Sequence, residues 1–104
     1  MFFKHVKIGD RLEIYEENKK DIVYASQVEE VKEKRALVIH MPISFGQYIK
    51  LKEKNKYTVI FFTDSGLLRY EAVIEKHKVE DGFNLTEIKL NSNGERMQRR
   101  EFFR

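Results

Sequence analysis

The densest set of side chains able to do chemistry lies at the end of the chain. Residues 95–104 carry four arginines and two glutamates, a net charge of +2, and the other 94 residues carry the remaining +1 of the total of +3. Arginine guanidinium groups bind anions such as phosphate through paired N–H donors. A nearly balanced body with a basic end therefore favours a local anion site over a broad nucleic-acid-binding face.

Within this segment Arg100 and Arg104 are four residues apart, but this spacing alone is a weak signal. Seven arginines in 104 positions give about 0.5 such pairs by chance, and Arg96 with Arg100 is a second instance. From the spacing alone, a solvated basic tail stays open. Phe102 and Phe103 favour a contact in this segment, because exposed phenylalanine is usually spent on packing.

The rest of the sequence shows no arrangement of catalytic or metal-binding residues. His5, His40 and His77 are scattered, and no two of them have the four-residue spacing of a metal-binding helix. No serine stands in a nucleophile-elbow context, although a Ser-His-Asp triad is defined by geometry and stays open. The five glycines stand singly, so there is no glycine-rich phosphate loop. We expect no catalytic residue, no metal and no cofactor, and a protein that is not an enzyme.

Composition is typical of a small cytoplasmic domain. With 41% apolar and 36% charged residues, 104 positions suit one well-solvated domain with one core. The absence of cysteine excludes disulfides and fits a reducing compartment. The start at Met1–His5 runs directly into charged residues and lacks the apolar stretch of a signal peptide. The longest apolar runs, Ala36–Ile39 and Val59–Phe62, are too short to cross a bilayer, so no membrane insertion is expected.

Alternation of apolar and polar residues with period two dominates the chain and predicts strands. Pro42 cannot donate to a sheet ladder and should end one strand, and Asp64-Ser65-Gly66 and Asp81-Gly82 are typical of turns. The segment Tyr57–Thr63 is apolar on both faces, which favours a central strand. The predicted strands cover approximately residues 12–15, 22–31, 36–41, 48–51, 57–63, 68–75 and 83–90. Six or seven short strands predict an all-β fold, a small antiparallel barrel or sandwich.

Two strands show irregular phase. The apolar phase of residues 22–31 slips before Val31, which indicates a bulge or the end of the strand, and the phase of residues 83–90 shifts before Ile88, which indicates a bulge there. Residues 28–37 also have glutamate and lysine spacing that could form a helical turn. We favour a strand in this segment because β-branched residues flank it.

Several stretches together resemble one known family. Those in the predicted barrel are Ile8-Gly9-Asp10 as an opening turn, Tyr24-Ala25-Ser26-Gln27-Val28 as a second strand, Val38-Ile39-His40-Met41-Pro42 followed by Gly46, and Leu67-Leu68-Arg69-Tyr70-Glu71-Ala72 as an aromatic hairpin strand. The end of the chain, Gln98-Arg99-Arg100-Glu101-Phe102-Phe103-Arg104, resembles the linker that opens PilZ domains. These are features of YcgR-like flagellar brake proteins, which are PilZ-type cyclic di-GMP effectors. The resemblance spans essentially the whole chain, and the terminal motif is its most specific part.

The resemblance implies a fold, a ligand and a set of contact residues. The family's N-terminal domain is a split β-barrel, so residues 1–94 would form this barrel and residues 95–104 the linker that carries the start of a PilZ domain. An Arg-x-x-x-Arg element in that linker contacts cyclic di-GMP in the family. The resemblance thus implies that Arg100 and Arg104 bind the nucleotide, with Arg99 as a helper. Guanidinium groups suit a ligand with two guanines and two phosphates, because they match guanine O6 and N7 and stack on purines.

The chain departs from the family pattern where it stops. It ends at Arg104, before the PilZ barrel and the Asp/Asn-x-Ser-x-x-Gly element that completes the family's site. We expect the 104 residues alone to bind cyclic di-GMP weakly or not at all, because ordering a free tail costs conformational entropy. The implied function is regulatory control of flagellar motility in response to cyclic di-GMP. Flagellar motor or stator proteins are the implied partners, and the implied location is the cytoplasm, with association with the flagellar basal body.

Two other functions remain open from the sequence. A small nucleic-acid-binding barrel could use Tyr48, Tyr57 and Tyr70 for base stacking, but the near-neutral charge of residues 1–94 counts against it, and no nucleic acid is expected. A flavin-binding enzyme could use a split barrel, but no stretch resembles a flavin phosphate site.

Overall fold

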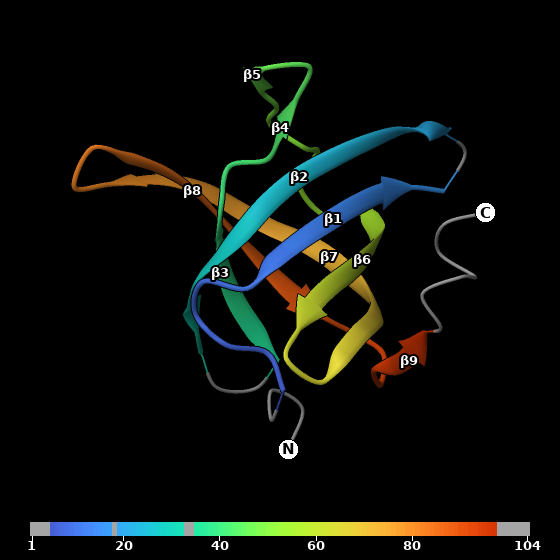
Figure 1. Cartoon of the computed structure of the whole chain (residues 1–104). Coiled ribbons are helices and arrows are strands. Elements are labelled where there is room, and N and C mark those ends of the chain that lie inside the picture. The colour runs from blue at the N-terminus through green and yellow to red at the C-terminus, as the bar shows by residue number, and fades with distance from the viewer. Residues whose placement is uncertain (1–4, 18, 33–34, 98–104) are drawn as a thin grey trace.

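The computed structural model (Figure 1) describes residues 5–17, 19–32 and 35–97. All the regular elements in this part of the chain are β-strands. The six longer strands are β1 (Arg11–Glu16), β2 (Lys19–Val31), β3 (Ala36–His40), β6 (Lys56–Thr63), β7 (Gly66–Glu80) and β8 (Phe83–Leu90). Three short strands are added to them: β4 (Ile43–Ser44), β5 (Gln47–Tyr48) and β9 (Glu95–Met97).

The six longer strands close into one antiparallel barrel. They pair in the order β1-β6-β7-β8-β3-β2, and β1 pairs with β2 as well as with β6, which completes the ring. Closure satisfies the backbone donors and acceptors that an open sheet would leave at its edges. The expected all-β antiparallel split barrel is confirmed, and β6 has the central position that its two apolar faces predict, between β1 and β7.

The barrel interior is filled by side chains that the period-two pattern directs inward. Leu12 and Ile14 of β1 are fully buried, whereas Arg11, the first residue of the same strand, is exposed. Phe61 of β6 is also fully buried and meets Tyr70 of β7 edge to face, with ring centroids 5.6 Å apart. Such aromatic pairs are stabilising beyond the apolar area that they bury. The other fully buried members of the described core are Val28, Leu37, Ile39, Val59, Ala72, Ile74, Ile88 and Leu90.

Both expected irregularities exist, but one lies on the neighbouring strand. The register of β2 against β3 shifts between Val28 and Glu30, which confirms the bulge before Val31. The register of β7 against β8 shifts between Ile74 and Lys76, so the extra residue belongs to β7. Strand β8 itself runs in unbroken register with β3, and a bulge within β8 was wrong. The helical alternative for residues 28–37 is also wrong for the residues described there, since these belong to β2, β3 and the turn between them.

The remaining segments are short strands and loops that lie outside the six-stranded ring. Strand β3 ends at His40, just before Pro42, as the missing N–H predicts. The strand expected over residues 48–51 is reduced to Gln47–Tyr48, and Leu51 is instead a buried anchor of the loop that follows. Strand β9 was not expected: residues 95–97 were assigned to the linker, yet they pair with Leu67–Arg69 of β7. Its placement brings the end of the described chain beside the β6–β7 turn (Figure 1).

Candidate functional site

The site expected from the sequence begins where the chain leaves the barrel, and β9 sets this point. Arg96 of β9 pairs with Leu68 of β7, and its guanidinium Nη1 donates a hydrogen bond of 2.6 Å to the backbone carbonyl of Ser65 in the β6–β7 turn. Arg69 of β7 contacts Glu95 across the same pair of strands at 3.2 Å. This second contact is exposed and contributes little. The hydrogen bond of Arg96 is exposed as well, so the backbone pairing of β9 with β7 is what mainly fixes the exit of the chain.

The connection from β8 to β9 is held down on β7. The backbone N–H of Glu71 donates to the Ser92 hydroxyl at 2.8 Å, and the N–H of Asn91 donates to the Glu71 carbonyl at 2.9 Å. Arg35 reaches the same connection, with its Nη2 3.3 Å from Oδ1 of Asn93. These bonds satisfy backbone groups of both the strand and the loop, so the chain approaches β9 in a defined direction.

Gly94 of this connection lies directly against a buried ring of the core. A Cβ atom at Gly94 would lie 2.5 Å from Cζ and 2.6 Å from the hydroxyl oxygen of Tyr70. Tyr70 is 4% exposed and packs against Phe61, so its ring has little room to give way. Burial raises the pKa of the Tyr70 phenol, and the positive charge of Arg35 opposes this shift. The absence of a side chain at Gly94 therefore allows the chain to cross Tyr70 on its way into β9.

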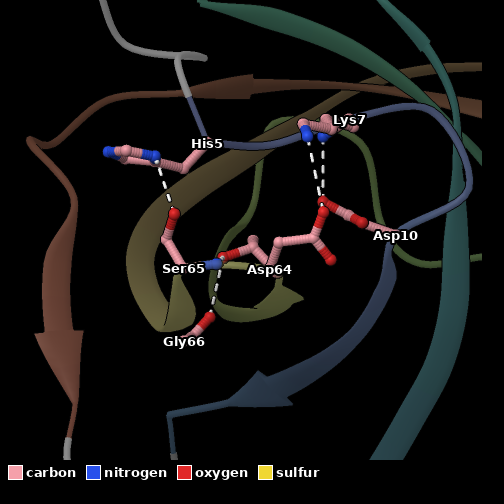
Figure 2. A network of polar contacts seen from close by, with 7 residues as sticks. His5, Lys7, Asp10, Asp64, Ser65 and Gly66 are labelled. Carbon is pink, nitrogen blue, oxygen red and sulfur yellow. Dashed lines mark hydrogen bonds and ion pairs between the residues drawn. The ribbon is translucent and has the colours of Figure 1, made fainter.

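The N-terminal segment closes over the other side of the same turn. Figure 2 shows Lys7 and His5 reaching toward the turn that follows β6. Lys7 Nζ lies 3.4 Å from Asp64 Oδ2, and the backbone N–H of Lys7 donates to Asp10 Oδ2 at 2.9 Å. Val6, which lies between His5 and Lys7 in the sequence, is 3% exposed and belongs to the core. The β6–β7 turn is thus held both by the N-terminal segment and by Arg96 of β9.

His5 and Ser65 form a contact between serine and histidine side chains, the residue types of a catalytic triad, but the surroundings of this pair are structural. Ser65 Oγ lies 3.0 Å from His5 Nδ1, while the Ser65 N–H donates to Thr63 Oγ1 and Thr63 Oγ1 donates to the Gly66 carbonyl. A catalytic triad needs a carboxylate that orients the imidazole, and among residues 5–17, 19–32 and 35–97 no carboxylate contacts His5. The pair is best explained as a latch between the N-terminal segment and the turn (Figure 2).

The other two histidines also hold structure. His77 on β7 contacts the Leu51 carbonyl through Nε2 at 2.6 Å and the Thr86 hydroxyl through Nδ1 at 2.9 Å. Since a carbonyl can only accept, Nε2 carries a proton and donates. His40 Nε2 lies 3.1 Å from Glu29 Oε1 at the outer surface. In the described ranges no three His, Asp or Glu side chains gather as metal ligands would.

Concave regions lie on the surface of the part of the barrel that the structure describes. One of about 470 Å³ is lined mainly by apolar groups beside the β4–β5 hairpin, with Arg11 stacked at 4.6 Å over the Phe62 ring at one end. A polar one of about 420 Å³ lies at the start of β6, and one of about 240 Å³ lies at the barrel mouth near Tyr24 and Tyr57. The three tyrosines considered for base stacking do not share a face: Tyr57 and Tyr70 are buried, at 5% and 4% exposed, and Tyr48 is 62% exposed.

The expected nucleotide-contacting residues, Arg99, Arg100 and Arg104, lie outside the residues that the structure describes. What the structure adds is the role of Arg96, which the sequence offered as a second partner for Arg100. Its guanidinium is engaged with the Ser65 carbonyl. The sequence held no signal for this contact or for the crossing of Gly94 over Tyr70, because both join residues more than twenty positions apart.

Comparison with known proteins identifies a matching family and a similar solved structure. The family model PilZNR, described as flagellar protein YcgR, matches residues 7–90. Among solved structures, the Bacillus subtilis inhibitor of motility MotI/DgrA superposes with a TM-score of 0.74 at 23% sequence identity, over 93% of this chain and 48% of that chain. The chain thus spans about half the length of that structure. A search of curated proteins finds no match. The chain, through the match over residues 7–90, therefore belongs to the family of the flagellar protein YcgR.

Proposed function

We propose that this domain is the regulatory barrel of a PilZ-type protein that controls flagellar motility in response to cyclic di-GMP. Membership of the YcgR family supports the coarser part, a regulator of motility. The protein with the similar fold is described as an inhibitor of motility. The ligand is our inference from the arginine-rich end of the chain.

The observation that supports the proposal is that the arginine residues directly follow a segment whose contacts with β7 fix where the chain leaves the barrel. The family match ends at residue 90, and the chain is then fixed to β7 through Ser92, Gly94 and β9. Arg99 and Arg100 follow β9 by two and three residues, and Arg104 comes four later. An exit held to β7 by these contacts fixes the point from which the arginine segment starts, which lowers the conformational entropy that nucleotide binding must remove.

In this proposal Arg100 and Arg104 bind the guanine bases and phosphates, and Arg99 assists. A PilZ barrel that continues from residue 104 in a longer protein would supply the opposite wall of the site. Binding then changes the relative position of the two barrels, and the changed surface is read by a motor or stator protein. Such a switch requires that the nucleotide contact the two arrangements differently.

The proposal is tested by calorimetric titration of the longer protein with cyclic di-GMP. Arg100→Lys and Arg104→Lys each keep the charge but lose the bidentate fork, and each should weaken binding by about tenfold or more. Lys89→Gln, which removes an exposed cation on β8, is the matched control and should leave the affinity unchanged. If the unchanged protein and the three variants all bound cyclic di-GMP with equal affinity, the arginines would not be part of the nucleotide site.

The same titration of the 104-residue chain alone should show weak binding or none, since these residues would supply only one wall of the proposed site. Micromolar affinity for the short chain would contradict the two-wall arrangement while leaving the arginine assignment to be judged by the substitutions.

A further inference from the structure

The β4–β5 hairpin carries exposed apolar side chains away from the barrel. Ile43 and Tyr48 face each other across the two strands and are 40% and 62% exposed. Phe45 at the tip is 92% exposed. Its φ of 53° and the φ of 77° at Gly46 place both residues in the left-handed region, which tightens the turn. Figure 1 shows this hairpin projecting beyond the rest of the sheet. A single exposed apolar residue is ordinary, but three on one projecting hairpin indicate a contact surface.

The chain that follows this hairpin is strongly basic. Residues 49–56 read Ile-Lys-Leu-Lys-Glu-Lys-Asn-Lys, four lysines against one glutamate, a net charge of +3. All four lysines are exposed. Lys54 lies 3.8 Å from Glu75 at the surface. Within the described ranges the other three, at positions 50, 52 and 56, have no carboxylate at ion-pair distance.

The lysines are held in place by the buried residues between them. Leu51 is 4% exposed, and its carbonyl accepts the hydrogen bond from His77. The Ile49 N–H donates to the Pro42 carbonyl at 2.7 Å, and the Lys52 N–H donates to the Tyr57 hydroxyl at 3.3 Å. Because Ile49 and Leu51 point toward the barrel, the intervening lysine and the next one point outward. The charges are therefore preorganised beside the hairpin, at the rim of the cavity near Tyr24 and Tyr57.

We propose that the hairpin–lysine surface, defined as residues 43–56, docks this domain on the headgroup region of an anionic lipid bilayer. Tyrosine favours the membrane–water interface, phenylalanine can insert its ring into the boundary between headgroups and acyl chains, and lysines near an anionic surface each add to the attraction. A projecting phenylalanine can enter a soft interface without a matching pocket, whereas a protein partner would need one. The docking is peripheral and involves no segment that crosses the bilayer: the described residues contain no helix long and apolar enough to do so. It is independent of nucleotide binding.

The test is co-sedimentation of the protein with vesicles. Vesicles of phosphatidylcholine with about 30% phosphatidylglycerol should bind the protein, and pure phosphatidylcholine vesicles should bind it much more weakly. Lys50→Gln with Lys52→Gln should lower the affinity by about 25-fold, because each lysine contributes about fivefold, or about 1 kcal/mol. Phe45→Ser should lower it by about fivefold. For the unchanged protein, raising the salt concentration from about 0.05 M to about 0.5 M should weaken binding to the anionic vesicles.

Two matched control variants distinguish binding through this surface from non-specific adsorption of the protein to vesicles. Lys89→Gln removes an exposed lysine on β8, and Phe83→Ser removes an exposed phenylalanine from the separate β7–β8 hairpin, where it is 60% exposed. Both should bind vesicles as the unchanged protein does. Absence of binding to anionic vesicles at low salt, or equal losses in the controls, would overturn the proposal. So would binding to soluble polyglutamate as strong as to vesicles and unaffected by Phe45→Ser, which would indicate an acidic protein as the partner.

Discussion

Replacing Gly94 with alanine tests whether the route into β9 is fixed by its crossing over Tyr70. The added Cβ would lie 2.5 Å from Cζ and 2.6 Å from the hydroxyl oxygen of Tyr70, distances that Cβ atoms in proteins essentially never show. Tyr70 is nearly buried and braced against Phe61, and the connection is tied to β7 through Ser92. Neither side can move by the required distance without breaking contacts. Overpacking of this kind costs about 1–3 kcal/mol.

The assay is unfolding by urea or heat, followed by circular dichroism. For a domain of this size we expect a loss of about 4–8 °C in the melting temperature per kcal/mol. In a Tyr70→Leu background, where the ring is gone, Gly94→Ala should cost much less, and the difference between the two costs is the coupling energy. Asn93→Ala, which removes only the contact with Arg35, is the control and should cost under about 0.5 kcal/mol. A Gly94→Ala cost below that value, or the same cost in both backgrounds, would refute the reasoning.

Two further predictions concern buried polar groups. His77→Ala should lower the free energy of unfolding by about 1–3 kcal/mol, because it leaves the Leu51 carbonyl and the fully buried Thr86 hydroxyl without their shared partner. His40→Ala, which loses an exposed contact with Glu29, should cost under about 1 kcal/mol, and equal losses in urea unfolding would contradict this assignment. Burial and the hydrogen bond to Glu16 raise the pKa of Tyr24 from 10.0 to about 12, so the folded state favours the protonated phenol. Its contribution to stability is complete below about pH 10 and is lost as the pH rises toward about 12. Unfolding measured at successive pH values should show a shallower loss in Tyr24→Phe, and an unchanged slope would contradict it.

The barrel was predictable because its signals are local. Alternation at Leu12 and Ile14 identified β1, two apolar faces identified β6 as central, and Pro42 marked the end of β3. Each of these follows from a side-chain period or a missing N–H within a few residues.

The remaining features depend on partners distant in sequence. The phase shift in residues 83–90 was assigned to β8, but a bulge is a relation between two strands, and the extra residue lies in β7. Strand β9 has only three residues, too few for alternation to show, and it exists because β7 offers a free edge at Leu67–Arg69. The resemblance at the end of the chain supplied the arginines, whereas the anchoring of Arg96 and Gly94 that precedes them required coordinates.

We propose that the arginine segment after β9 contacts cyclic di-GMP, and hydrogen exchange of a longer protein that includes a following PilZ barrel, measured with and without the nucleotide, tests this contact. We expect slower exchange of the amides of residues 98–104 when cyclic di-GMP is bound. Exchange in β3 and β8 should be unchanged, and the effect should be lost in the Arg100→Ala, Arg104→Ala double variant. Bound nucleotide that leaves the exchange of residues 98–104 unaltered would contradict it.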